Sequence, residues 1–327
     1  MLERCAREAG DRGGFAAVSD EQVREMAGRY TEEYIHEHLE DFREKSPRFV
    51  YLFRRLQKTV EQVVLDTAGE LRNSDFRPLD FELNFSGEED LGPERLGEGE
   101  SSLVLTGQVD RVDGWEKDGK LYIRVTDYKT GRREFSLSDV WYGMNLQMLL
   151  YLFALQREGE RRYGKPVEPA GVLYVPARDE IIRAPAMLTD QEILAEKAKK
   201  LRRSGLLLDE EAVLRAMEKG GEGFRYLPLK LNKDKEIAGD ALASAEQLGQ
   251  LSGYIAELLQ EMAGELRRGS IQADPWYRSS SEGACVYCSY FDACRFDETR
   301  DKPRYKTNLK APEFWKKLEE RRDKECP

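Results

Sequence analysis

The chain has 327 residues, with 52 Lys and Arg against 62 Asp and Glu, and a formal net charge of -10. This negative charge argues against a protein that coats DNA by bulk charge, but it leaves room for an enzyme with a local basic channel. A mean hydropathy of -0.67 and the lack of a long apolar run argue against a bilayer-spanning protein. The amino terminus has no apolar core of the signal-peptide type, so we predict a cytoplasmic protein without a membrane partner.

The first 75 residues are predicted to be helical. Residues 1–17 open as a helix that stops at Gly13-Gly14, and Ser19–Leu39 follows with Ser19 as its N-cap. Ser46-Pro47 then starts a long helix, because Ser suits the N-cap and Pro suits the first helical position. Its predicted buried stripe consists of Phe49, Leu52, Phe53, Leu56, Val60, Val63, Val64 and Leu71.

Strands begin in residues 76–235, which we predict to form the core of the fold. Phe76–Phe85 is the first predicted strand, with Glu82 at its centre, and the acidic, glycine-rich residues 86–102 are predicted to form a loop. Strands over Leu103–Val112 and Lys120–Tyr128 then flank Asp118-Gly119, a dipeptide typical of hairpin turns.

Two carboxylates and one amine are expected to meet at the end of this hairpin. Asp127 and Lys129 lie two residues apart, so they share one face of their strand. Asp110, on the neighbouring strand, can reach the same face. Mg²⁺ is often held by one or two carboxylates plus a substrate phosphate, and a nearby lysine can orient water or neutralise charge on the phosphate. The pattern therefore predicts metal-assisted phosphodiester hydrolysis.

A helix is predicted directly after the hairpin. Ser136 or Ser138 can cap it, and apolar and polar positions recur at helical spacing in Val140, Met144, Gln147, Tyr151 and Leu155. Gln147 and Tyr151 are four residues apart and share one face. A glutamine within an apolar stripe needs a polar neighbour, which the predicted acidic site can supply.

The remaining predicted elements are a strand at Ala170–Val175, a helix at Leu188–Lys200, a strand at Phe224–Leu229 and a long helix at Ser244–Arg268. Basic residues gather in Lys129–Arg133, Lys197–Arg203 and Arg300–Lys317. We interpret the middle group, which falls on a predicted helix, as a solvent-exposed face.

Three cysteines fall close together in the carboxy-terminal part, residues 236–327. The spacing Cys285-x-x-Cys288-x5-Cys294 allows the thiolates to wrap one soft metal centre, either zinc or an iron–sulfur cluster. Disulfides are not expected in a reducing compartment.

Three motifs in the chain resemble the RecB-type nuclease motifs of the PD-(D/E)XK superfamily, and AddB-type nuclease domains in particular. They are Gly107-Gln108-Val109-Asp110-Arg111-Val112-Asp113, Asp127-Tyr128-Lys129-Thr130-Gly131 and Gln147-Met148-Leu149-Leu150-Tyr151-Leu152. The resemblance implies an α/β, restriction-endonuclease-like fold: a mixed central sheet flanked by helices, a helical amino-terminal segment and a carboxy-terminal cysteine loop of the iron–sulfur type. It also implies the site residues: Asp110, Asp127 and the backbone carbonyl of Tyr128 ligate Mg²⁺ or Mn²⁺, Lys129 serves the attacking water, and Gln147 and Tyr151 complete the site.

The resemblance further implies a 4Fe–4S cluster on Cys285, Cys288 and Cys294. The family takes its fourth cysteine from far upstream, and this chain has no match there, because Cys5 follows that place and Cys326 lies beyond the loop. Zinc is the alternative metal. The family's upstream histidine motif also has no match, since His36 stands in a different context.

By this resemblance the chain is a Mg²⁺-dependent exonuclease domain that cuts single-stranded DNA ends. It would act in double-strand-break repair as the nuclease part of an AddAB/RecBCD-like helicase–nuclease, with an AddA-type subunit as partner. The chain contains no Gly-x-x-x-x-Gly-Lys-Ser/Thr phosphate loop, so this part is not expected to hydrolyse ATP by that route. The alternative is a catalytically impaired DNA-binding or scaffold domain of the same complex.

Overall fold

The computed structural model of the chain describes residues 1–39, 45–85, 94–96, 103–131, 134–183, 187–220, 223–279, 281–301 and 303–325. Two compact units are formed: the first from Met1–Gly92, Thr106–Phe135 and Met148–Leu248, and the second from Pro93–Leu105, Ser136–Gln147 and Gly249–Pro327. These limits run across the three-part division expected from the sequence, which stays a prediction. Within the described ranges, no helix combines the length and apolarity that crossing a bilayer requires.

A six-stranded mixed sheet forms the centre of the first unit. The strand order is β1-β4-β5-β6-β7-β10, with β5–β6 and β7–β10 parallel and the other neighbours antiparallel. The strands are β1 (Arg77–Asn84), β4 (Gln108–Lys117), β5 (Lys120–Lys129), β6 (Val167–Pro176), β7 (Ser204–Leu208) and β10 (Leu242–Ala243). The predicted α/β class with a mixed sheet is confirmed, and short strands β8 (Lys230–Leu231) and β9 (Ile237–Ala238) pair separately.

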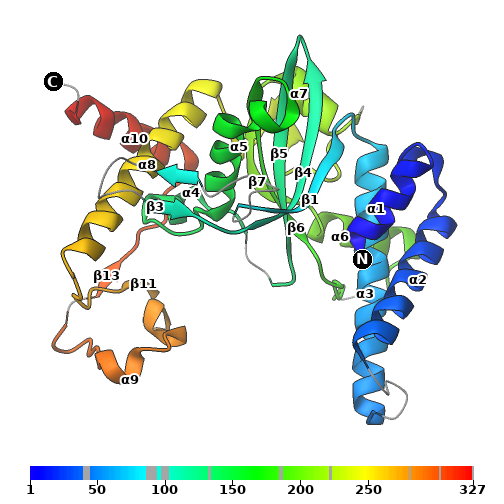
Figure 1. The fold of residues 1–327 in the computed structure, drawn as a ribbon, viewed down its shortest axis with the longest axis horizontal. Helices are drawn as coiled ribbons and strands as arrows, with labels where there is room; N and C mark the ends of the chain where they lie inside the picture. The colour runs from blue at the N-terminus through cyan, green and yellow to red at the C-terminus, as the bar shows by residue number, and fades with distance from the viewer. Residues whose placement is uncertain are drawn as a thin grey trace. The chain divides into compact units, whose positions relative to one another are not determined.

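Helices flank this sheet on both sides (Figure 1). They are α1 (Leu2–Asp11), α2 (Asp20–His38), α3 (Pro47–Arg72), α5 (Gln147–Tyr163), α6 (Asp190–Lys200) and α7 (Glu211–Met217). The predicted caps hold: Ser19 forms a capping box with Gln22, and Ser46 caps α3 with Pro47 in its first turn. Of these helices, α3 and α5 lie on opposite sides of the sheet.

The hairpin that carries the predicted acidic residues forms as expected. Lys117 pairs with Lys120, so the loop between them has two residues, Asp118 and Gly119. Both have positive φ, 52° and 77°, which identifies the type I′ turn that matches the twist of the flanking strands.

Three predicted elements are wrong in their limits. The strand expected over Leu103–Val112 is interrupted at Thr106-Gly107, because Gly107 takes a φ of 154°; β3 (Leu103–Leu105) pairs instead with β2 (Glu94–Leu96). The helix expected after Ser136 breaks into α4 (Leu137–Trp141) and α5, since Gly143 and Asn145 both have positive φ between them. Residues Phe224–Leu229 form no strand.

The second unit contains the long helix α8 (Ala245–Arg267) apart from its first residues. Its other elements are β2, β3, α4, β11 (Trp276–Ser279), β12 (Glu282–Gly283), the 3₁₀ turn Ala284–Tyr287, α9 (Phe291–Cys294), β13 (Arg304–Tyr305) and α10 (Ala311–Glu325). Strand β11 pairs with both β12 and β13. This small sheet carries the cysteine segment.

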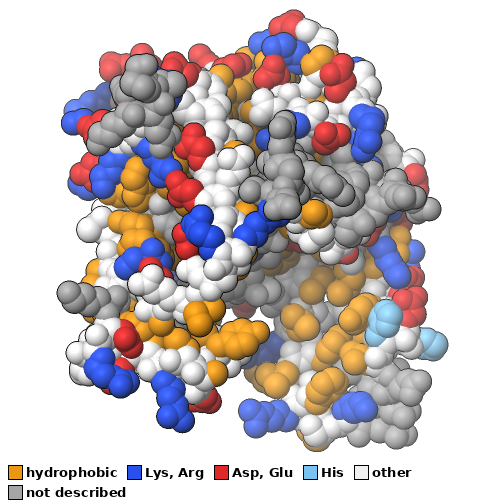
Figure 2. All heavy atoms as spheres, turned by 60° about the vertical axis from the view of Figure 1, so that its left-hand side comes forward, with side chains coloured by type: hydrophobic (Ala, Val, Ile, Leu, Met, Phe, Trp, Pro, Cys, Tyr) orange, Lys and Arg blue, Asp and Glu red, His pale blue; other side chains and the backbone are white. Residues whose placement is uncertain are grey.

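The apolar stripe predicted along α3 is only half buried. Val64 is 1% exposed, as expected, whereas Phe49, Leu52 and Leu56 are 38%, 50% and 54% exposed. Figure 2 shows hydrophobic side chains gathered on the surface beside the two histidines of α2. The carboxy-terminal half of α3 therefore packs on the core, while its amino-terminal half presents apolar side chains to solvent.

Candidate active site

Asp110 and Asp127, the acidic pair, lie next to each other at one end of the β4–β5 hairpin. The last residues paired between these strands are Arg111 and Thr126, so Asp110 and Asp127 occupy the following position of the same register. The carboxylate of Asp110 accepts a 2.8 Å hydrogen bond from the backbone amide of Tyr128. This bond fixes Asp110 against the residue that separates Asp127 from Lys129.

The pKa of Asp110 is raised, first because the carboxyl group is largely removed from solvent and then because the charge of Asp127 repels its ionised form. The amide of Tyr128 and the ammonium of Lys129 act in the opposite direction. A site that crowds two carboxylates in this way favours a bound cation.

Lys129 forms an ion pair with Asp127, with 2.6 Å between Nζ and Oδ2. The ammonium also lies 5.1 Å from the centre of the Tyr174 ring, on the adjacent strand β6. The expected arrangement of Asp127 and Lys129 on one face of β5 therefore places the amine beside the acidic pair.

A third carboxylate, that of Glu82, belongs to the same electrostatic environment. In the register between β1 and β4, Phe81 pairs with Arg111 and Leu83 with Val109, so Glu82 lies opposite Asp110. Its charge contributes to the raised pKa of Asp110. Glu82 is exposed, and its side chain accepts a hydrogen bond from Gln108.

The acidic pair is suited to a divalent cation. Oδ2 of Asp127 is buried and makes no hydrogen bond, since the nearby Lys129 ammonium approaches at an angle outside hydrogen-bond geometry. In the described ranges no three His, Cys, Asp or Glu side chains gather as a metal site. Two carboxylates are enough for Mg²⁺, which keeps several waters and takes further oxygens from the substrate. The backbone carbonyl of Tyr128 stays a predicted additional ligand.

The two helical residues of the predicted site differ in their placement. Tyr151 is buried in α5, stacks on Phe85 with 4.9 Å between ring centres, and holds its hydroxyl against Gly107. Gln147 is the first residue of α5 and belongs to the second unit, so its role stays a prediction.

A buried ion network lies on the other face of the hairpin, against α3. It consists of Asp66, Glu70, Arg111, Asp113, Arg124 and Arg203, three carboxylates and three guanidinium groups. Glu70 receives three arginines, and its contacts with Arg124 and Arg203 are both 2.7 Å. Burial opposes the ionisation of Glu70, but the three arginines outweigh it and lower its pKa to about 2.

This network supports the site through the residues next to the acidic pair. Arg111 follows Asp110 in β4, and its guanidinium group contacts the hydroxyl of Tyr128, which follows Asp127 in β5. Burial raises the pKa of Tyr128 to about 12, so its hydroxyl stays protonated. The sequence analysis did not identify the network, although arginines inside two otherwise buried strands were a visible signal.

The three cysteines of the predicted cluster are free thiols in the second unit. Cys285 is half-buried, while Cys288 and Cys294 are exposed. They do not converge as a metal-binding group, since no such group of three ligands occurs in the parts of the chain that are described. The thiol positions therefore do not fit an iron–sulfur cluster, and Cys326 lies outside the described residues.

Comparison with known proteins agrees with the resemblance predicted from the motifs. Residues 2–295 match the family model of the PD-(D/E)XK nuclease superfamily. The chain is 35% identical over 278 residues to the B-type subunit of the ATP-dependent helicase/deoxyribonuclease of Clostridium acetobutylicum, which covers 84% of this chain and 24% of that protein. The corresponding protein of Acetivibrio thermocellus is 36% identical over 277 residues, covering 83% and 24%. That of Clostridium novyi is 32% identical over 323 residues, covering 97% and 27%.

The chain thus spans 24–27% of the length of these relatives. The matched region contains β4, β5 and α5, the elements that carry the acidic pair, Lys129 and Tyr151. The family match over nearly the whole chain and the mixed sheet with its acidic rim lead to one conclusion: the chain belongs to the PD-(D/E)XK nuclease superfamily.

Proposed function

We propose that this chain is a Mg²⁺-dependent deoxyribonuclease domain that hydrolyses phosphodiester bonds at single-stranded DNA ends. One observation carries the proposal: Asp110 and Asp127 occupy adjacent positions at the rim of the sheet, with the Lys129 ammonium 2.6 Å from Asp127. The relatives are named as B-type subunits of a helicase/deoxyribonuclease, which supports a place in a larger DNA-processing complex with a helicase partner of the AddA type. We expect this complex to act in the cytoplasm, in double-strand-break repair.

In the proposed mechanism, Asp110 and Asp127 hold the cation, and Mn²⁺ can replace Mg²⁺. When bound, the cation supplies Lewis-acid stabilisation of the charge that develops on the phosphate. The ammonium of Lys129 orients the attacking water and neutralises charge on a phosphate oxygen. Tyr151 holds the segment around Gly107 that leads into Asp110.

The test is nucleotide release from end-labelled single-stranded DNA in Mg²⁺. Asp127→Asn and Lys129→Ala are each expected to lower the cleavage rate by roughly 100-fold or more, because each removes a group that acts on the developing charge. Asp118→Asn is the matched control, since Asp118 lies in the turn at the other end of the hairpin and asparagine tolerates its positive φ. Undiminished release in both site variants would refute the assignment.

The second candidate function is a DNA-binding scaffold without turnover. One observation favours it: the chain has two histidines, and His36 and His38 both occupy exposed positions of α2, so neither replaces the family's upstream histidine at the acidic pair. DNA binding by the unmutated chain with no nucleotide release in Mg²⁺ or Mn²⁺ would favour this candidate over the first.

A 4Fe–4S cluster or a zinc ion on Cys285, Cys288 and Cys294 stays a prediction from the family resemblance, which the observed thiol positions do not support. Visible absorbance together with iron and zinc analysis of the purified chain tests it. A colourless preparation without either metal would exclude both centres.

A further inference from the structure

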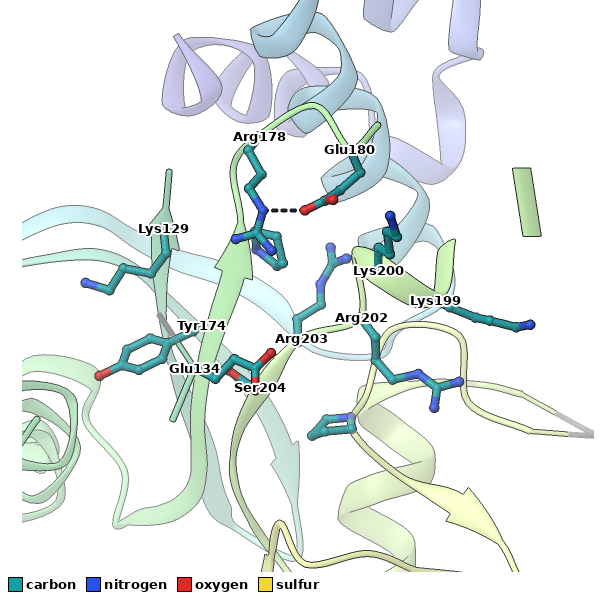
Figure 3. Close-up of a pocket in the computed structure, with 12 residues that line it drawn as sticks. Lys129, Glu134, Tyr174, Arg178, Glu180, Lys199, Lys200, Arg202, Arg203 and Ser204 are labelled. Atoms are coloured by element: carbon teal, nitrogen blue, oxygen red, sulfur yellow. Dashed lines mark hydrogen bonds and ion pairs between the residues drawn. The ribbon is translucent and has the colours of Figure 1, made fainter. Parts of the chain in front are cut away.

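A hollow with a volume of about 480 Å³ lies beside Lys129, between the end of β6, the end of α6 and the start of β7. Its lining is strongly basic (Figure 3). Six cations, Lys129, Arg178, Lys199, Lys200, Arg202 and Arg203, line it against the two carboxylates of Glu134 and Glu180. We call this feature the basic hollow. A local excess of positive charge stands out in a chain whose net charge is -10.

Most of these cations have carboxylate partners. Arg178 forms an ion pair with Glu180, and Figure 3 draws this contact at the upper rim of the hollow. Arg203 is buried and pairs with Glu70 of the ion network. Lys129 pairs with Asp127. These ion pairs hold the walls of the basic hollow in place.

Lys200 and Arg202 are different, because each donates only to a backbone carbonyl. Lys200 Nζ lies 2.9 Å from the carbonyl oxygen of Ile181, and Arg202 lies 2.7 Å from that of Phe224. Neither meets a carboxylate within the ranges that the structure describes. Their charges are therefore uncompensated, and an anion in the basic hollow would compensate them.

We propose that the basic hollow binds a phosphate group of the DNA strand that the nuclease cuts. A phosphate suits this lining because lysine binds it as a point charge and arginine as a planar fork. The volume lies within the usual range for ligand pockets. Lys129 borders both the basic hollow and the acidic pair, so the bound phosphate belongs to a nucleotide close to the scissile bond.

This inference rests on the proposed function for the identity of the strand. It also revises the interpretation of Lys197–Arg203 as a purely solvent-exposed face, because four residues of that group line the basic hollow. The phosphate can be an internal phosphodiester of the strand or the phosphate at its end. Both present the same charged oxygens, and the experiment distinguishes them.

The experiment measures binding of a 3′-labelled single-stranded oligonucleotide by fluorescence anisotropy in EDTA. Lys200→Gln and Arg202→Gln are each expected to raise Kd by roughly 5- to 10-fold and to reduce the slope of log K against log salt by about 0.7, the value for one phosphate contact on a single strand. Lys197→Gln is the matched control, because Lys197 lies on the same helix but faces Asp179 outside the basic hollow. Circular dichroism checks that these exposed substitutions leave the fold intact.

A variant of opposite sign excludes a general loss of structure. Glu134→Gln removes a negative charge from the lining and is expected to tighten binding by roughly 2- to 5-fold. Oligonucleotides with a 5′-phosphate and a 5′-hydroxyl then separate the two sources. A defect confined to the 5′-phosphorylated strand assigns a terminal phosphate, and an equal defect on both assigns an internal one.

The proposal is overturned if Lys200→Gln and Arg202→Gln bind as the unmutated chain does, or if Lys197→Gln weakens binding equally. Because binding is measured without metal, this outcome is independent of the cleavage assay. Loss of the proposed function would appear instead as cleavage that survives Asp127→Asn.

Discussion

Asp110 and Arg111 are neighbours in β4 whose side chains point to opposite faces of the sheet. Asp110 joins the acidic pair, while Arg111 joins the buried ion network on the face of α3. The same alternation separates Asp127 from Tyr128 in β5. At the scale of single residues, each strand thus supplies both a reactive group and the group that supports it.

Glu70 is the residue on which the network depends most. Glu70→Gln removes the charge that three arginines share, and breaking a buried pair in this way is expected to lower the free energy of unfolding by about 3–5 kcal/mol. Urea denaturation at neutral pH measures the loss. Lys120→Gln, which breaks an exposed ion pair with Glu168, is the control and is expected to change stability by less than about 1 kcal/mol.

The pH dependence of stability follows from the same carboxylate. The pKa of Glu70 falls from an ordinary value of 4.5 to about 2 on folding, so its contribution is fully present above pH 4.5 and is lost as the pH falls toward 2. The stability difference between the unmutated chain and Glu70→Gln should therefore narrow over that interval. A difference that stays constant from pH 6 to pH 3 would contradict the assigned role.

Gly107 determines where β3 ends and β4 begins. Its φ of 154° and the Tyr151 hydroxyl, 1.9 Å from where a Cβ would stand, leave no room for a side chain. Gly107→Ala is expected to destabilise the chain by about 1–3 kcal/mol in a thermal or urea unfolding experiment. Gly10→Ala, at an open position of α1, is the control and should be neutral or stabilising.

A double variant tests the cause of that loss. Tyr151→Phe removes the hydroxyl that the alanine would meet, so it should recover part of the stability lost in Gly107→Ala. If the two losses simply add, the contact between these residues is not the reason for the glycine.

The two halves of α3 give a matched prediction on packing. Val64→Ala removes a side chain that is 1% exposed and should cost about 1–3 kcal/mol of unfolding free energy. Leu56→Ala removes a larger side chain that is 54% exposed, yet it should cost less than about 1 kcal/mol. Equal losses would show that the amino-terminal half of α3 is packed after all.

Much of this arrangement could be predicted at the scale of elements. Helix caps at Ser19 and Ser46 and the turn at Asp118-Gly119 were visible, because local hydrogen bonding and backbone geometry decide them. The break at Gly107 was not, because the ring of Tyr151, distant in sequence, occupies the space there. The burial of α3 was misjudged for a similar reason, since helical periodicity does not say how far a helix extends beyond the core.

For the whole molecule, the acidic character of the chain and its local basic surface are compatible. The net charge of -10 limits non-specific attraction to nucleic acid, while the basic hollow concentrates cations beside the acidic pair. The acidic pair was predictable from strand alternation alone. The basic hollow was not, because it joins β5, β6 and α6 across about 75 residues of sequence.

The central claim is that Asp110 and Asp127 hold one divalent cation between them, and a Mn²⁺ titration followed by electron paramagnetic resonance tests it most directly. We predict bound Mn²⁺ in the unmutated chain and in Asp118→Asn, and an affinity roughly 100-fold or more weaker in Asp110→Asn and Asp127→Asn. Mn²⁺ affinity that is unchanged in both site variants would contradict the account.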